Sequence, residues 1–247
     1  MRNSVLRGVR NGVSGKCVPK PEFGNEAYAR LNGNDEESVA VTFNGFPKET
    51  LTFLRELAEN NDRGWFDANR QRYEDYFLAP SLAYIEAMQR PLAKISPMYQ
   101  AVPKKSGGSL MRIFRDVRFS KDKSPYKTNI GIHLRHEAGC DVHAPGFYVH
   151  IEPGQCFVGA GVWHPGGEAL RAIREAIDTR PSDWKKARDH KTFRARYELA
   201  GDSLKRPPQG FDADHPLVED LKRKDFIGVA GLDDEAVTSP TFVQDSL

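Results

Sequence analysis

Charged side chains suited to binding an anion are concentrated in one short segment of the chain, residues 112–127. The segment reads RIFRDVRFSKDKSPYK and contains three arginines and three lysines against two aspartates. An arginine fork matches the oxygens of a carboxylate or a phosphate bidentately, and a lysine adds a compact point charge. With Asp116 orienting the arginines, the remaining positive charge predicts binding of a small anionic phosphate or carboxylate compound. The predicted ligand-binding residues are Arg112, Arg115, Asp116, Arg118, Lys123, Tyr126 and Lys127.

The same segment fits a second hypothesis, a non-catalytic structural or protein-interaction domain in which these residues form an internal ion-pair network. Buried positive charge is costly unless it is paired. Under this hypothesis carboxylates from other segments, such as Glu152 or Asp141, neutralise the arginines. The residue types alone leave both hypotheses open.

A third hypothesis is a nucleic-acid-binding module, in which Phe114, Phe119 and Tyr126 would stack on bases. The charge of the whole chain argues against it. There are 36 basic and 34 acidic residues, and the formal net charge is +2. Nucleic-acid-binding proteins usually carry an obvious basic excess, so we expect no nucleic-acid partner.

Histidines gather after this segment, with five of the seven between residues 133 and 164. Strand-like alternation places His133 and His150 on one polar face with Arg135 and Glu152. A histidine beside arginines can transfer a proton near neutral pH, so His150 and His133 are the candidate catalytic residues. Whether the chain is an enzyme stays open.

His133, His150 and Glu152 are also the candidates for a metal site, since imidazoles and a carboxylate can share a metal ion. No established metal-binding motif contains them. We therefore predict no metal and no other cofactor.

The spacing within residues 112–127 is R-x-x-R-D-x-R-F-x-x-x-K-x-P-Y. It resembles the signature of a bacterial family known as domain of unknown function 2461, and the resemblance covers residues 42–245. A second similarity to this family is formed by Asn60, Asn61, Trp65, Phe66, Asn69 and Tyr73, although a turn with a core aromatic pair also explains it. The resemblance implies no particular activity. Similar members continue into a further C-terminal helix, which implies that this helix is truncated here.

Cysteine content and hydropathy limit where the protein can work. Cys17, Cys140 and Cys156 lack C-x-x-C spacing and are odd in number, so a reducing cytoplasm is expected and a disulfide framework is not. No apolar run approaches the roughly 18 residues of a membrane-spanning helix. We expect no membrane partner, and the sequence does not determine the oligomeric state.

Hydrophobic periodicity predicts an α+β fold. Period-3.6 patterns precede residue 100 and return after residue 167, whereas residues 111–120, 128–135, 147–152 and 156–163 read as strands. Short turns between the strands favour a central antiparallel β-meander over about residues 111–163. We expect the N-terminal and C-terminal helices to cover one face and the open polar face to present His133, Arg135, His150 and Glu152.

The chain is expected to contain one folded domain, residues 41–247, after a different N-terminal stretch. Residues 1–40 are basic and poor in acids, and they contain no apolar signal-peptide core. This composition is typical of a disordered extension. A transit segment and a start assigned too far upstream are the alternatives.

Overall fold

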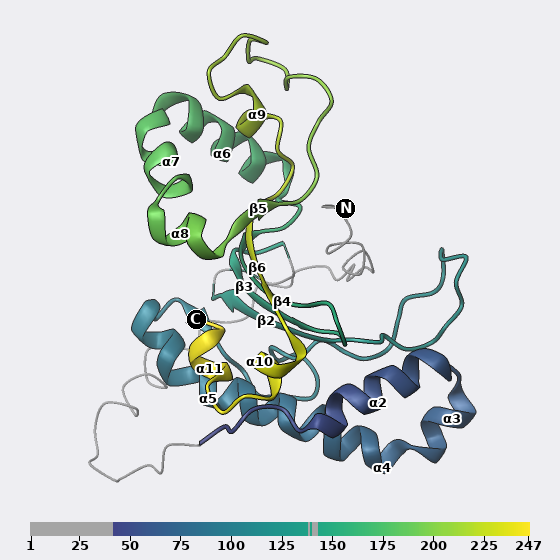
Figure 1. The fold of residues 1–247 in the computed structure, drawn as a ribbon. Coiled ribbons are helices and arrows are strands. Elements are labelled where there is room, and N and C mark those ends of the chain that lie inside the picture. The colour runs from purple at the N-terminus through teal and green to yellow at the C-terminus, as the bar shows by residue number, and fades with distance from the viewer. Residues whose placement is uncertain (1–41, 138, 140–142) are drawn as a thin grey trace, which may run out of the picture.

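The computed structural model describes residues 42–137, 139 and 143–247 (Figure 1). The expected basic extension over residues 1–40 lies outside these residues. Cys140 also lies outside them, as does Asp141, which was proposed as a carboxylate that neutralises the arginines.

The N-terminal third of the described chain is helical, because its apolar residues recur every three or four positions. Leu51, Leu54 and Leu57 form one buried face of the first helix. The side chain of Asp62 caps the next helix by accepting a hydrogen bond from the backbone N–H of Trp65 at 2.9 Å. The elements are α2 (Lys48–Glu59), α3 (Arg63–Ala68), α4 (Arg70–Tyr73), the π-helical turn η2 (Glu74–Leu78) and α5 (Ala79–Ile95).

A six-stranded antiparallel sheet forms the centre of the molecule, in the order β1-β2-β3-β4-β6-β5. Its strands are β1 (Tyr99–Gln100), β2 (Ile130–His136), β3 (Gly146–Ile151), β4 (Cys156–Val162), β5 (Glu198–Ala200) and β6 (Phe226–Leu232). The predicted meander is confirmed in β2, β3 and β4. β6 lies inside the sheet, between β4 and β5.

The predicted strand over residues 111–120 is wrong. Only isolated bridges join this region to its neighbours, between Leu110 and Ile132 and between Phe114 and Tyr126. The carboxylate of Asp116 accepts a hydrogen bond from the backbone N–H of Arg118 at 3.2 Å. This local contact turns the backbone away from a ladder, as short acidic side chains commonly do.

The C-terminal helices divide into two groups. In Figure 1, α6 to α9 gather beyond one end of the sheet, where Ile177, Leu217, Leu221 and Phe226 form a small core of their own. The last two helices instead pack with α5 and the sheet, in the main core. The helices of this third are α6 (Gly167–Thr179), α7 (Pro181–Arg188), α8 (Lys191–Arg196), α9 (Val218–Leu221), α10 (Asp234–Thr238) and α11 (Phe242–Asp245).

This arrangement confirms the α+β class with a central antiparallel sheet. One face of the sheet carries the main core, which contains Ile130, Ile132, Val149 and Val158. The side chains at the alternating positions point to the opposite face, where His133 of β2 and His150 of β3 lie.

Candidate functional site

The charged segment folds into an irregular hairpin beside β2. The backbone N–H of Arg115 donates to the carbonyl of Pro125 at 2.9 Å, and that of Lys127 donates to the carbonyl of Ile113 at 2.7 Å. These two bonds bring the arginine end of the segment against its lysine end.

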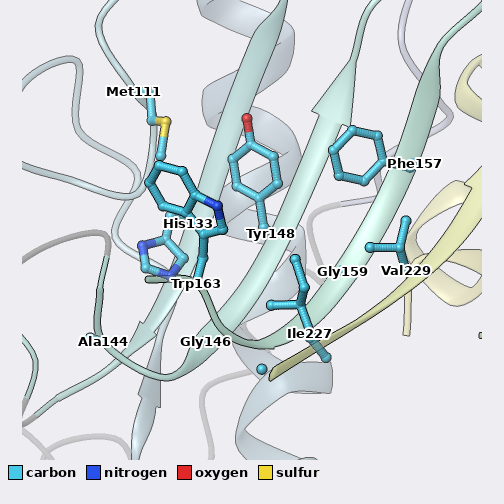
Figure 2. A pocket seen from close by; sticks show the side chains of 12 residues that line it. Met111, His133, Ala144, Gly146, Tyr148, Phe157, Gly159, Trp163, Ile227 and Val229 are labelled. Carbon is cyan, nitrogen blue, oxygen red and sulfur yellow. The ribbon is translucent and has the colours of Figure 1, made fainter. Parts of the chain in front are cut away.

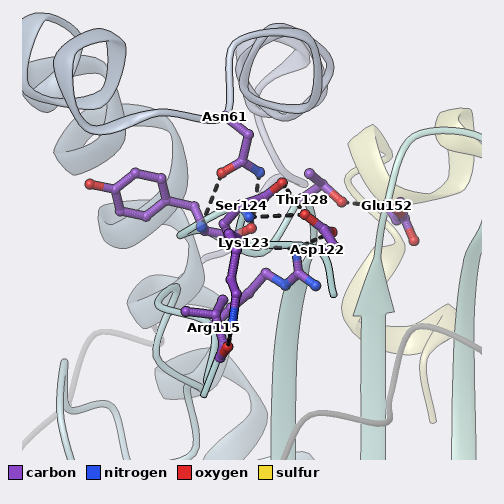
Figure 3. A network of polar contacts seen from close by, with 9 residues as sticks. Asn61, Arg115, Asp122, Lys123, Ser124, Thr128 and Glu152 are labelled. Carbon is purple, nitrogen blue, oxygen red and sulfur yellow. Dashed lines mark hydrogen bonds and ion pairs between the residues drawn. The ribbon is translucent and has the colours of Figure 1, made fainter. Parts of the chain in front are cut away.

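Tyr126 anchors this hairpin to the helices. Its ring is buried and stacks on Phe66 with centroids 4.1 Å apart. The amide side chain of Asn61 donates to the Tyr126 carbonyl and accepts from its backbone N–H, both at 3.0 Å (Figure 3). The structure therefore places this predicted ligand residue in the core, where it holds the hairpin in position.

Two aspartates of the segment each take one arginine. Arg118 donates to Asp116 through Nε at 2.9 Å and through Nη2 at 2.6 Å, and these hydrogen bonds lower the pKa of Asp116 to about 2. Asp122 accepts from the hydroxyl and the N–H of Ser124 and from Arg115, and together they hold the pKa of its carboxyl well below the usual range (Figure 3). Asp122 was not among the residues predicted from the sequence.

Lys123 is held by the backbone, since its Nζ donates to the carbonyl of Val117 at 2.9 Å. Within the part of the chain that the structure describes, the side chains of Arg112, Lys121 and Lys127 make no hydrogen bond and no ion pair. Lys121 is exposed, whereas Arg112 and Lys127 lie close enough for the charge of one to act on the other. Lys127 is half-buried, and its pKa is lowered by this burial and by the nearby charge of Arg112. Arg112 and Lys127 are therefore two neighbouring cations without an ion pair in the described structure, although the charge of Arg112 contributes to the lowered pKa of Asp116.

His150 lies at the centre of a polar chain on the second face of the sheet. Its Nε2 is 3.2 Å from Oε2 of Glu152, and its Nδ1 is 3.2 Å from the Tyr148 hydroxyl and 3.4 Å from Nδ2 of Asn129. The hydrogen bond with His150 is the main cause of a lowered pKa at Glu152. The carboxylate also accepts from Thr128 at 3.1 Å (Figure 3).

Thr128 and Asn129 directly follow Lys127 in the chain, so the end of the charged hairpin and the His150 chain are neighbours. The structure thus brings His150 and Glu152 next to one part of the predicted anion site. His133 lies further along β2, opposite Tyr148. Among the described residues, no group of three metal-ligating side chains is placed to hold a metal ion.

The expectation of an open, polar face is wrong at the histidines. His150 is 2% exposed and His133 is 8% exposed. The cause is aromatic packing, because Phe157 stacks on His150 with ring centroids 4.7 Å apart. Arg135 and Glu152 remain partly exposed at the margins of this face.

A small pocket opens on the same face, over β2, β3, β4 and β6 (Figure 2). Its cavity volume is about 60 Å³. Most of its lining is apolar or glycine, and the residues are Met111, His133, Ala144, Gly146, Tyr148, Phe157, Gly159, Ala160, Gly161, Trp163, Ile227 and Val229.

Sequence reasoning missed several residues of these sites. Tyr148 could have been found, since strand alternation places it on the face of His150. Outside these sites, the contact between Asp225 and His164 could not have been found. The two residues lie 61 positions apart, and the backbone N–H and Nδ1 of His164 both contact the buried carboxylate of Asp225. Such pairing depends on the position of β6 beside β4, which no local pattern indicates.

The fold and these sites define an α+β protein with a cationic hairpin and an apolar pocket on one sheet. Comparison with protein families matches residues 49–247 to the family described as "Conserved hypothetical protein (DUF2461)". The chain belongs to this family. Searches of curated proteins and of solved structures found no match. Across the described residues, the helices are too short or too polar to cross a membrane.

Proposed function

We propose that this protein binds a small anionic ligand, a phosphate or a carboxylate compound, at Arg112 and Lys127. The observation that supports the proposal is the distribution of charge in the hairpin. Asp116 and Asp122 form ion pairs with Arg118 and Arg115, whereas Arg112 and Lys127 form none among the described residues. Arg112 acts on Asp116 through its charge alone, without a hydrogen bond. An anion would supply the opposite charge that these two side chains lack.

The other predicted residues would act around this pair. Arg115, Arg118 and Lys123 would shape the hairpin and attract the anion, with Asp116 and Tyr126 fixing its conformation. His150, next to the Lys127 end, is the candidate for proton transfer if the ligand is a substrate, and Glu152 would orient its ring. His133 is a second candidate, further along β2.

The alternative, an internal ion-pair network, is favoured at Arg115 and Arg118 by their contacts with aspartates. It does not account for Arg112 and Lys127. A cytoplasmic location would suit either function, as the odd number and the spacing of the cysteines predict.

The proposal is tested by measuring the melting temperature of the protein in inorganic phosphate, pyrophosphate and citrate at constant ionic strength. A ligand that binds only the folded state stabilises it and so raises this temperature. The stabilisation is roughly 2.7 kcal/mol when the ligand concentration is one hundred times the dissociation constant. We expect at least one anion to raise it, and Arg112→Gln and Lys127→Met to abolish the rise.

Lys121→Gln is the matched control, because Lys121 is an exposed lysine of the same hairpin and its substitution changes the net charge by the same amount. It should retain the response. The absence of any response in the unmodified protein at millimolar anion, or an equal loss in the Lys121 variant, would contradict a specific site.

A further inference from the structure

The pocket in Figure 2 exists because glycines replace side chains on the second face of the sheet. Gly161 has other reasons to be glycine, because its φ is +133° and a Cβ there would overlap the carbonyl oxygen of Phe226. Gly159 does not. A Cβ there would meet only ordinary contacts, 3.5 Å from the Gly228 carbonyl oxygen and 3.8 Å from Val229. Neither the backbone nor the local packing requires glycine at this position, and its effect is to keep the pocket open.

The hydroxyl of Tyr148 is a polar group of the pocket lining whose orientation is set by hydrogen bonding to His150. Glu152 accepts from Nε2 of His150, which leaves Nδ1 as an acceptor for the Tyr148 O–H and for Asn129. Burial and the charge of Glu152 raise the pKa of Tyr148, so its hydroxyl stays protonated at neutral pH. With its proton directed at His150, the hydroxyl oxygen still has lone pairs with which to accept a hydrogen bond.

The lining also limits the charge of a ligand. It contains no carboxylate, lysine or arginine, and its one ionisable side chain besides Tyr148 is the buried His133. An ion would lose its hydration there without gaining an opposite charge. The pocket therefore favours an uncharged group, unlike the hairpin.

The lining and the volume together define the size of that group. The volume of about 60 Å³ is well above the roughly 10–15 Å³ that a cavity needs to hold one water, so the pocket has room for a small organic group. Tyr148, Phe157 and Trp163 provide aromatic walls for it (Figure 2).

We propose that this pocket binds a small, uncharged, mostly apolar group, such as a single saturated or aromatic ring, that donates one hydrogen bond to the Tyr148 hydroxyl oxygen. The pocket does not include Arg112 and Lys127, which would hold the anion, although both sites use the chain from Glu152 through His150. Gly159 provides the space, and the chain from Glu152 through His150 orients the acceptor.

The test uses cyclopentanol and cyclopentanone as probes, because they have the same size but only the alcohol can donate a hydrogen bond. Both are titrated to millimolar concentrations into isotopically labelled protein while amide NMR signals are followed. We expect shifts at residues lining the pocket and tighter binding of the alcohol by about fivefold. Tyr148→Phe should remove this preference while both probes still bind.

Gly159→Ala should weaken both probes by about tenfold, because a methyl group fills part of the pocket. Gly231→Ala is the matched control on β6, since a Cβ there has nothing within 4 Å and Gly231 does not line the pocket. It should bind both probes normally, as should Arg112→Gln. The inference is overturned if neither probe shifts the pocket signals, if Gly159→Ala binds as well as the unmodified protein, or if the Tyr148 variant keeps the preference for the alcohol.

Discussion

Two aspartates determine which cations of the hairpin are available to a ligand. Asp116 and Asp122 lie two and seven residues from the arginines that they bind, so their pairing is local and leaves Lys127 without a carboxylate in the described structure. Burial is also the main cause of the lowered pKa of Lys127. A cation held in this way destabilises the protein when no ligand is bound, which is the opposite of what a structural ion pair does.

This difference predicts that Lys127→Met stabilises the free protein, because methionine keeps the apolar stem and removes the charge. The pKa of Lys127 is lower in the folded than in the unfolded state, where it is about 10.4. The cost of the charge is therefore fully present at neutral pH and disappears as the pH rises through the folded pKa towards 10.4.

We expect the free energy of unfolding in urea to rise by about 1 kcal/mol at pH 7, and the gain to shrink as the pH approaches 10. Lys121→Met, in the same hairpin, should change stability by less than about 0.5 kcal/mol. A loss of stability in Lys127→Met would instead favour the structural network.

At the level of secondary structure, the sequence predicted the strands that depend on side-chain alternation within one segment. The alternation of Ile130, Ile132 and Leu134 with polar or small residues predicted β2. The same alternation in the following strand predicted that His150 and Glu152 share one face, and their side chains are in contact. It failed over residues 111–120, where the contact from Asp116 to the backbone of Arg118 competes with strand pairing. Burial of His150 was not predictable either, because it depends on Phe157 from the neighbouring strand.

The close pairing of β4 and β6 predicts a strong effect of Gly161→Ala. The φ of Gly161 is +133°, and a Cβ would overlap the carbonyl oxygen of Phe226. Relief requires the two strands to separate, so we expect a loss of about 2–4 kcal/mol in the free energy of unfolding. Gly231→Ala, on β6 itself, should cost less than about 0.5 kcal/mol, since a Cβ there meets nothing within 4 Å. Urea unfolding followed by tryptophan fluorescence distinguishes the two, and similar values for both would contradict the packing described.

At the level of the whole molecule, the first and last described elements complete one core. The backbone N–H of Phe46, just before α2, donates to the carbonyl of Val237 in α10 at 3.0 Å. Phe242 of α11 contacts the rings of Phe46 and Tyr84, and Figure 1 places α11 beside α5. The C-terminal residues therefore support α5 and the segment before α2. This same main core contains Phe66 and Tyr126, which position the charged hairpin.

This connection predicts that Phe242→Ala destabilises the whole protein even though the residue lies far along the chain from the hairpin. Its side chain is 0% exposed, and truncating a buried phenylalanine costs about 3–5 kcal/mol. Phe119→Ala removes the same atoms from a ring that is 95% exposed, so it should change stability by less than about 0.5 kcal/mol. If the elements share one core, circular dichroism and tryptophan fluorescence should report the same shifted transition in urea for Phe242→Ala. Separate transitions would show instead that the small core around α6 and α9 unfolds independently of the one that supports the hairpin.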